Sequence, residues 1–146
     1  MKKILIFYFS RSGNTKTMAQ LIHKELTKSS DVQVDIKTQV VPEELAQYDA
    51  ILIGAPTYHH RMTQTISTLL EDTAMKEVKL EGKLGAAFGS FGWSGEAPRL
   101  VLEVMENIFQ MNIIKPPLLI KYAPRGDGPS KCQEFSARII QELEKC

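Results

Sequence analysis

The sequence predicts an α/β fold of the doubly wound type, with a five-stranded parallel sheet and helices on both of its faces. Two observations support this prediction. Strand-like and helix-like segments alternate along the chain, and several strand-like segments are continuous apolar runs, as expected for strands that are covered on both faces. No linker, repeat or low-complexity segment interrupts the alternation, so we expect residues 1–146 to form a single domain.

The first half of the chain contains three of the predicted strands. Residues 4–9 are a continuous apolar run, residues 32–37 alternate between aliphatic and polar side chains, and residues 50–55 are again apolar. A helix over residues 15–28 follows the first strand, because its apolar side chains recur at the spacing of one helical face; they are Met18, Leu21, Ile22 and Leu26. We expect a single helical turn over residues 43–48.

The second half continues the alternation. Residues 84–88 predict the fourth strand, and residues 113–114 and 118–122 predict a fifth, which two prolines interrupt. Apolar residues at helical spacing predict the three remaining helices. They are Met62, Ile66, Leu69 and Leu70; then Val101, Val104, Met105 and Ile108, with Pro98 in the first turn; and finally Phe135, Ile139, Ile140 and Leu143.

Composition excludes several classes of function. The formal net charge is +1 at pH 7, so we expect no general attraction to nucleic acid or to an anionic membrane. The apolar run at residues 4–9 is too short for a signal peptide, and no stretch is long enough to span a bilayer. Cys132 and Cys146 form neither a disulfide framework nor a metal-binding motif. The sequence therefore predicts a cytoplasmic protein without a metal site.

The candidate ligand site lies where three strands end. In doubly wound sheets, ligands bind beyond the carboxyl ends of the strands. Residues 10–15, 56–61 and 90–96 leave those ends, and each segment is rich in polar, glycine or aromatic residues. We therefore expect these three loops to form one site.

The first loop is typical of a phosphate-binding turn. It leads into a helix N-terminus, where free N–H groups and the positive end of the helix dipole attract anions. Gly13 permits close approach of the backbone, and Ser10, Ser12 and Thr15 add hydroxyl donors. Arg11 either reaches the phosphate or faces solvent. The alternative to a phosphate site is an ordinary tight turn with a good helix cap.

Known reactive phosphate loops do not match the first loop. It lacks the lysine of a nucleoside triphosphate loop, the GxGxxG pattern of dinucleotide-binding folds and the cysteine of a phosphatase. The third predicted strand ends in Gly54, Ala55 and Pro56, without the aspartate of a response regulator. What remains is a loop that holds a phosphate monoester without reacting with it.

The second and third loops add aromatic side chains. Tyr58 and Trp93, the only tryptophan, are expected at the same edge of the sheet, where stacking on a flat ring would explain them. Gly92 and Gly95 allow backbone groups to approach the edge of that ring. A phosphate cradle beside an aromatic slot indicates a mononucleotide and favours a flavin. The alternative for Trp93 is ordinary packing over a helix end.

The charged residues of these loops have two interpretations. His59, His60 and Arg61 either form a solvated turn or place positive charge beside the ring, where they would tune its potential or dock a partner. Glu96 is expected to help start a helix, because a negative charge is favourable near a helix N-terminus.

These motifs resemble those of flavodoxins. Residues 10–15 resemble the FMN-phosphate signature of that family, and residues 54–58 and 89–96 are similar to the flavodoxin module of flavodiiron proteins, also called A-type flavoproteins. The resemblance implies strand order 2-1-3-4-5 and non-covalent FMN. We predict that the residues that bind FMN are Ser10, Arg11, Ser12, Gly13, Asn14, Thr15, Pro56, Thr57, Tyr58, His59, Ser90, Phe91, Gly92, Trp93, Gly95 and Glu96.

The resemblance implies an electron carrier that works between a reductase and an acceptor protein, as a monomer or weak dimer. The three histidines cannot supply the ligands of a diiron module, so any diiron centre would have to belong to another chain. A separate diiron protein is therefore one candidate for the acceptor. Net charge also departs from the strong acidity usual in flavodoxins, and the second loop lacks the Trp and the Gly-Asp pair familiar in many of them. The alternatives are a small FMN-dependent NAD(P)H:quinone oxidoreductase and a binding module that has lost its cofactor.

Overall fold

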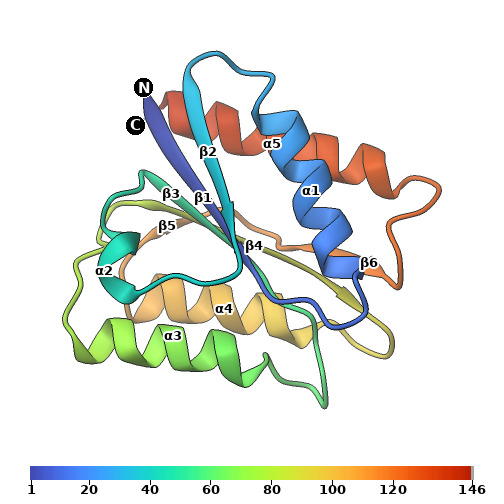
Figure 1. Ribbon diagram of the computed structural model, residues 1–146, viewed down its shortest axis with the longest axis horizontal. Helices are drawn as coiled ribbons and strands as arrows, with labels where there is room; N and C mark the ends of the chain where they lie inside the picture. The colour runs from blue at the N-terminus through green and yellow to red at the C-terminus, as the bar shows by residue number, and fades with distance from the viewer. Residues whose placement is uncertain (146) are drawn as a thin grey trace.

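The sheet is parallel and is covered by helices on both faces (Figure 1). The computed structural model describes residues 1–145, so Cys146 lies outside the described residues. The strands are β1 (Lys2–Tyr8), β2 (Val32–Lys37), β3 (Ala50–Gly54), β4 (Leu84–Phe91), β5 (Asn112–Ile113) and β6 (Leu118–Lys121). The helices are α1 (Asn14–Leu26), α2 (Pro42–Leu45), α3 (Gln64–Met75), α4 (Glu96–Asn107) and α5 (Gly128–Glu144).

The strand order is β2-β1-β3-β4-β5, which confirms the predicted order 2-1-3-4-5. β5 pairs with the beginning of β4 and β6 pairs with its end, so both form one edge of the sheet. Pro116 and Pro117 lie between them, as the sequence indicated, because proline has no N–H to donate to a strand ladder.

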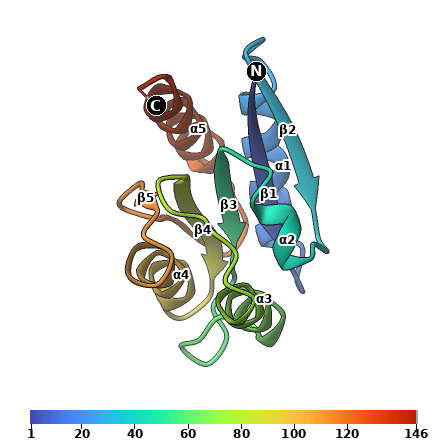
Figure 2. The same cartoon turned by 90° about the vertical axis from the view of Figure 1, so that its left-hand side faces the viewer.

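Helices α1 and α5 cover one face of the sheet, and α3 and α4 cover the other (Figure 2). Alternate residues of the central strands face two separate cores, one on each side. On β1, Ile4 and Ile6 pack toward α1 and α5, whereas Leu5 and Phe7 pack toward α2, α3 and α4. All four side chains are buried. Burial on both faces explains why this segment reads as a continuous apolar run rather than as an alternating one.

β4 is longer than the sequence predicted, and this moves part of the third loop into the sheet. The strand continues past residue 88 because Gly89, Ser90 and Phe91 pair with β6. A side chain at Gly89 would collide with the carbonyl of Ala55 and would lie 2.9 Å from the ring of Pro98. Glycine therefore permits the close approach of chain segments at the end of the strand that carries the third loop.

Within residues 1–145, no helix is long and apolar enough to cross a bilayer.

Candidate functional site

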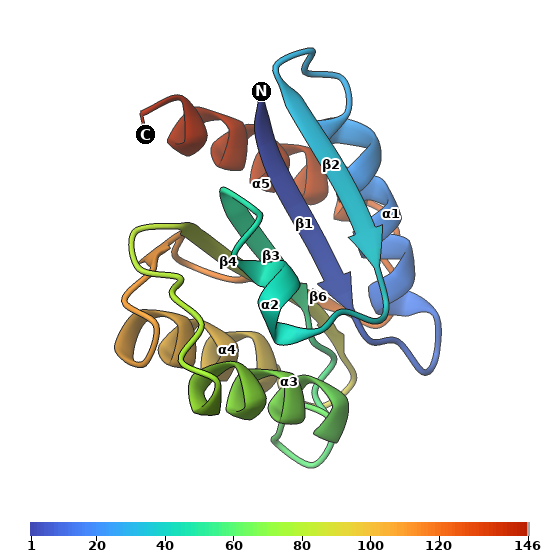
Figure 3. The same ribbon diagram turned by 60° about the vertical axis from the view of Figure 1, so that its left-hand side comes forward.

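The three predicted loops leave the same edge of the sheet, at the carboxyl ends of β1, β3 and β4 (Figure 3). Parallel pairing of these strands brings their ends together, because neighbouring parallel strands run in the same direction. Hydrogen bonds and a cation–ring contact join all three loops, so their geometry supports the prediction that they form one site.

The first loop closes on its own serines. The N–H of Gly13 donates to Ser10 Oγ at 3.0 Å, and the N–H of Asn14 donates to Ser12 Oγ at 3.4 Å. Each serine accepts a bond from the backbone and keeps its own hydroxyl hydrogen for a further acceptor. Gly13 stands at the N-cap of α1 with φ 94°, a conformation that favours glycine.

No acidic residue lies in the first turn of α1. The helix N-terminus therefore keeps the positive partial charge that attracts an anion. The hydroxyls of Ser10 and Ser12 supply neutral donors around this position, because each serine accepts a backbone N–H, from Gly13 or Asn14, and keeps its own hydrogen free. This set of donors fits a phosphate monoester.

Thr15 has a different place from the other hydroxyl residues of this loop. Its side chain is fully buried, and Oγ1 lies 2.9 Å from Ser90 Oγ. The same oxygen accepts the N–H of Ser90 at 3.3 Å. Thr15 therefore ties the start of α1 to the end of β4, and its hydroxyl is already engaged inside the protein.

The second loop is a tight hairpin that the sequence did not reveal. Tyr58 and Arg61 exchange two backbone hydrogen bonds of 3.0 Å around His59 and His60, which have φ 52° and 64°. Two central residues with positive φ define a type I′ turn, for which Asn-Gly is the common sequence. The left-handed conformation costs a non-glycine residue about 1–2 kcal/mol, so surrounding contacts have to maintain it.

Side-chain contacts fasten this hairpin to the third loop. His60 Nδ1 lies 3.2 and 3.3 Å from the two carboxylate oxygens of Glu96 and 3.1 Å from Ser94 Oγ. Ser94 Oγ also donates to Glu96 at 2.7 Å. Thr57 Oγ1 accepts the N–H of Ala97 at 2.9 Å and so caps the start of α4.

These bonds explain the role of Glu96. The hydrogen bond from Ser94, and then that from His60, hold the pKa of the Glu96 carboxyl below its ordinary value. Glu96 lies in the first turn of α4, as the sequence indicated, and its carboxylate also holds the second loop. His60 and Ser94 are absent from the predicted site, since only the fold brings residues 34 and 36 positions apart into contact.

Arg11 connects the first loop to the second. Its guanidinium carbon lies 4.8 Å from the centre of the Tyr58 ring. Stacking of this kind is favourable between a cation and the face of an aromatic ring. The sequence left a phosphate contact and a position in solvent as alternatives for Arg11, and the structure places its exposed side chain on Tyr58.

Trp93 is 90% exposed, so the expected alternative of ordinary packing over a helix end is wrong. Together with Thr57, His59, His60 and Ser94, it lines a hollow of about 260 Å³. Tyr122, 60% exposed, lies next to the same loop: a side chain at Gly92 would be 3.4 Å from its ring. Two exposed aromatic side chains thus flank Gly92, an arrangement that suits a flat ligand.

Tyr122 is absent from the predicted FMN-binding residues, because the sequence pattern assigned it to the end of the predicted strand over residues 118–122 rather than to a loop. A second hollow, of about 530 Å³, includes Tyr122 together with Asn14, Lys121, Ala123 and Arg125. The presence of Asn14 in this lining puts the end of β6 beside the turn that precedes α1. The signal available in the sequence was a large aromatic residue at the end of a predicted strand.

The remaining predicted residues occupy supporting positions. Pro56 and Ser90 are buried, and Phe91 is partly buried at the end of β4, where its carbonyl accepts the N–H of Tyr122 at 2.8 Å. Gly95 stands at the N-cap of α4, and a side chain there would lie 3.1 Å from Leu119. These residues shape the loops from beneath.

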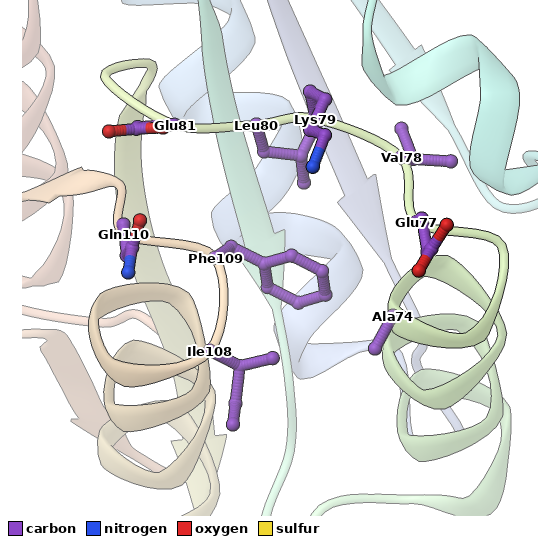
Figure 4. A pocket seen from close by; sticks show the side chains of 9 residues that line it. All are labelled: Ala74, Glu77, Val78, Lys79, Leu80, Glu81, Ile108, Phe109 and Gln110. Atoms are coloured by element: carbon purple, nitrogen blue, oxygen red, sulfur yellow. The ribbon is translucent and has the colours of Figure 1, made fainter.

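Another hollow, of about 230 Å³, lies at the opposite end of the strands, where the chain enters β4 and β5 (Figure 4). It is near the C-terminal ends of α3 and α4, and its lining includes Glu77, Glu81 and Phe109. Helix C-termini and carboxylates repel anions, so this hollow does not suit a phosphate. Among residues 1–145, no group of three His, Cys, Asp or Glu side chains is placed to hold a metal ion.

The loops therefore fit FMN on two independent grounds. The turn before α1 offers neutral hydroxyl and amide donors at a helix N-terminus without nearby acids in its first turn. The third loop carries an exposed tryptophan with a second aromatic ring close by. The first feature suits a phosphate and the second suits an aromatic ring system.

Comparison with known sequences agrees with this chemistry. A profile of the flavodoxin domain matches residues 5–119. Type A flavoprotein fprA of Rhodobacter capsulatus is 35% identical over 148 residues, which cover 97% of this chain and 33% of that protein. The nitric oxide reductase of Moorella thermoacetica is 27% identical over 147 residues, covering 97% of this chain and 36% of that protein. The chain thus spans about one third of the length of the curated relatives it matches.

Solved structures show the same relationship. A flavodoxin from the domain Archaea has a TM-score of 0.85 and 35% identity, over 97% of this chain and 99% of that chain. The Flv1 flavodiiron core of Synechocystis sp. PCC6803 has a TM-score of 0.82 and 27% identity, over 99% of this chain and 36% of that chain. This chain therefore belongs to the flavodoxin family, the family of FMN-binding electron-transfer proteins that its three loops indicated.

Proposed function

We propose that this chain carries single electrons between redox proteins, with FMN held by the three loops at the carboxyl edge of the sheet. The observation that carries the proposal is the acid-free N-terminus of α1, with two serines in the turn before it, in a sheet whose third loop exposes Trp93. When bound, FMN supplies the one-electron chemistry, and the protein supplies binding, orientation and electrostatics.

The phosphate end is assigned to the first loop. Ser10 and Ser12 each keep a hydroxyl hydrogen available, and the backbone N–H groups at the start of α1 point along the helix dipole. Thr15 positions this turn through its bond to Ser90 rather than by facing the ligand. Arg11 adds positive charge nearby while it stacks on Tyr58.

The ring end is assigned to the second and third loops. Trp93 and Tyr122 offer aromatic faces on either side of Gly92, and Thr57 lines the hollow beside Trp93. The contacts of His60 and Ser94 with Glu96 hold the two loops together, so that the ring site is formed before a ligand arrives. Preorganisation of this kind lowers the entropy cost of binding.

The structure favours a carrier over an enzyme with its own substrate. Trp93 is exposed at the rim, and the connections around it are short, so a ring placed there would remain accessible to a docking protein. A carrier needs an accessible ring edge and a brief, weak contact. No contact of the described residues specifically favours the NAD(P)H:quinone oxidoreductase alternative.

Partners remain part of the proposal. We infer a reductase and an acceptor, and a separate diiron protein is one acceptor that fits, since relatives of this chain include a flavodiiron core. The cytoplasmic location and the single domain over residues 1–146 also stay predictions.

The test uses Ser12, which is exposed at the turn before α1. Ser12→Asp introduces a negative charge beside the phosphate, whereas Ser12→Ala removes only the hydroxyl. We expect Ser12→Ala to weaken FMN binding by about tenfold or less and Ser12→Asp to weaken it much further, because a like charge opposes the dianion. Fluorescence titration of the FMN-free protein measures both.

Riboflavin, which lacks the phosphate, is the matched ligand. Riboflavin should bind the wild type less tightly than FMN does. Its own affinity should be nearly the same for the wild type, Ser12→Asp and Ser12→Ala. Equal FMN affinity in the wild type and Ser12→Asp would contradict the phosphate assignment. Steady turnover of NAD(P)H with a quinone, without an added reductase, would instead support the enzyme.

A further inference from the structure

Four cations surround the proposed FMN site, and we call them the basic rim: Arg11, Arg61, Lys121 and Arg125. All four are exposed. Arg11 belongs to the loop after β1, Arg61 to the hairpin after β3, Lys121 to the end of β6 and Arg125 to the segment between β6 and α5. Three different connections and the last residue of β6 thus place positive charge at the same edge of the sheet.

The rim is not neutralised by carboxylates. Among the described residues, Arg11, Arg61, Lys121 and Arg125 form no ion pair, whereas six other lysines do; they are Lys28, Lys37, Lys76, Lys115, Lys131 and Lys145. Two rim cations rest on aromatic rings instead: Arg11 on Tyr58 at 4.8 Å and Lys121 on Tyr122 at 5.5 Å. A ring holds a cation in place without cancelling its charge.

The acidic residues near this edge are already engaged. Glu96 contacts Ser94 and His60, and Asp127 forms an ion pair with Lys131 at 3.4 Å. The free positive charge therefore belongs to the rim, while the net charge of the chain is only +1. The polarity of this edge is a local property that the overall composition conceals.

We propose that the basic rim docks the acidic face of a redox protein, with the bound FMN at the centre of the contact. This inference rests on the proposed function and names the chemistry of its partner. An acidic surface complements the rim, steers the encounter and still permits rapid release, because charges at an interface rim act mainly on the association rate. One electron then passes between the partner's redox centre and the FMN, without any bond being formed or broken.

An acidic protein fits better than a nucleic acid. Nucleic-acid binding usually depends on a continuous track of phosphate contacts and on many released counterions. The rim is instead local to the aromatic site, because Arg11 lies on Tyr58, Lys121 lies on Tyr122, and Arg125 lines the same hollow as Tyr122. This arrangement suits a compact contact around one redox centre.

The first arm of the experiment measures the sign of the local field. The FMN-loaded protein is reduced, and its oxidation by anionic ferricyanide and by cationic hexaammineruthenium is followed by stopped flow across a range of ionic strength. We expect the ferricyanide rate to fall as salt rises and the hexaammineruthenium rate to increase. The phosphate dianion of FMN makes the net charge of the loaded protein slightly negative, which by itself would give the reverse slopes, so the expected slopes would report the rim.

The second arm uses proteins. Reduced plant-type ferredoxin, an acidic donor, should reduce the oxidised FMN-loaded protein at a rate that falls with salt. The rate at which basic cytochrome c oxidises the reduced protein should not fall as the salt concentration rises. A rate for ferredoxin that does not change with ionic strength would overturn the proposal.

Charge reversal supplies the matched comparison. The double variant Arg61→Glu with Lys121→Glu lies on the rim, and Lys76→Glu with Lys79→Glu makes the same change of charge beyond the end of α3. We expect the rim variant to slow the ferredoxin reaction by about tenfold or more at low salt and the control to change it little. Equal effects of the two variants would refute a local docking site.

Absorption by bound FMN, recorded for each variant, separates this inference from the proposed function. A protein that never binds FMN would defeat the proposed function itself. A protein that binds FMN normally but shows no difference between rim and control variants would defeat only the docking surface. Binding of a single-stranded RNA that is lost in the rim variant, without any effect on ferredoxin, would assign the rim to nucleic acid and overturn the proposal.

Discussion

The bond between Thr15 and Ser90 supports the most direct test of how the site is built. Thr15→Val keeps the shape of the buried side chain and removes the hydroxyl that lies 2.9 Å from Ser90 Oγ and accepts the Ser90 N–H at 3.3 Å. The hydroxyl and the backbone N–H of Ser90 then both lose this partner in the interior. Leaving a buried polar group unpaired costs about 1–3 kcal/mol of unfolding free energy.

The expected loss can be measured in the FMN-free protein by urea and thermal unfolding. For a chain of this size, 1 kcal/mol corresponds to roughly 3–4 °C in Tm, so Thr15→Val should lower Tm by about 3–12 °C. Ser90→Ala is the partner variant. The double variant should cost less than the two single variants together, because the second substitution removes the group that the first one left unpaired.

Additive costs would refute this account of the Thr15–Ser90 pair. The same variants also test positioning of the phosphate turn. If Thr15 acts through Ser90, both single variants should weaken FMN binding, and the double variant should weaken it little more than either alone. A loss of FMN affinity in Thr15→Val without any loss in Ser90→Ala would instead indicate that Thr15 contacts the phosphate itself.

Three further predictions follow from individual contacts. Gly89→Ala should destabilise the FMN-free protein by about 1–3 kcal/mol in urea unfolding, since its side chain meets the carbonyl of Ala55, whereas Gly92→Ala has room and should change little; equal losses would contradict the packing argument. Glu96 has a lowered pKa in the folded state, so it stabilises the protein above pH 4.5, its ordinary value, and this contribution is lost as pH falls through the folded pKa. In Glu96→Gln the fall of Tm on acidification should therefore be shallower than in the wild type, and parallel Tm curves would contradict it. Burial raises the pKa of the Cys132 thiol to about 11, so alkylation at about pH 8, followed by mass spectrometry of its peptide, should be slow in the folded protein and fast in urea; equal rates would be the opposite result.

Elements whose signals are local were predictable. The continuous apolar run at β1 and the helical spacing of Met18, Ile22 and Leu26 in α1 depend only on near neighbours, and the structure confirms both. The turn before α1 was recognisable for the same reason, because a glycine among hydroxyl residues between a strand and a helix is typical of an anion-binding turn. Boundaries were less accurate, and β4 ends at Phe91 because its pairing with β6 outlasts its apolar run.

The parts of the site that escaped prediction depend on contacts between distant segments. His59 and His60 do not have the composition of a type I′ turn, and this turn is fastened by Glu96, 36 positions after His60. Tyr122 came next to the third loop only through the pairing of β4 with β6. Local preference contains no information about such pairs.

The amino-acid sequence by itself determined the layers of the fold and the position of the turn before α1 that we propose as the phosphate site, because periodicity and helix-start chemistry act over a few residues. Only the tertiary structure decided that Thr15 is engaged with Ser90, that Trp93 is exposed and that Arg11 lies on Tyr58. It also gathered Arg61, Lys121 and the other rim cations at one edge of a chain with almost no net charge. These outcomes depend on how parallel strands bring remote loops together, and that is set by packing of the whole sheet.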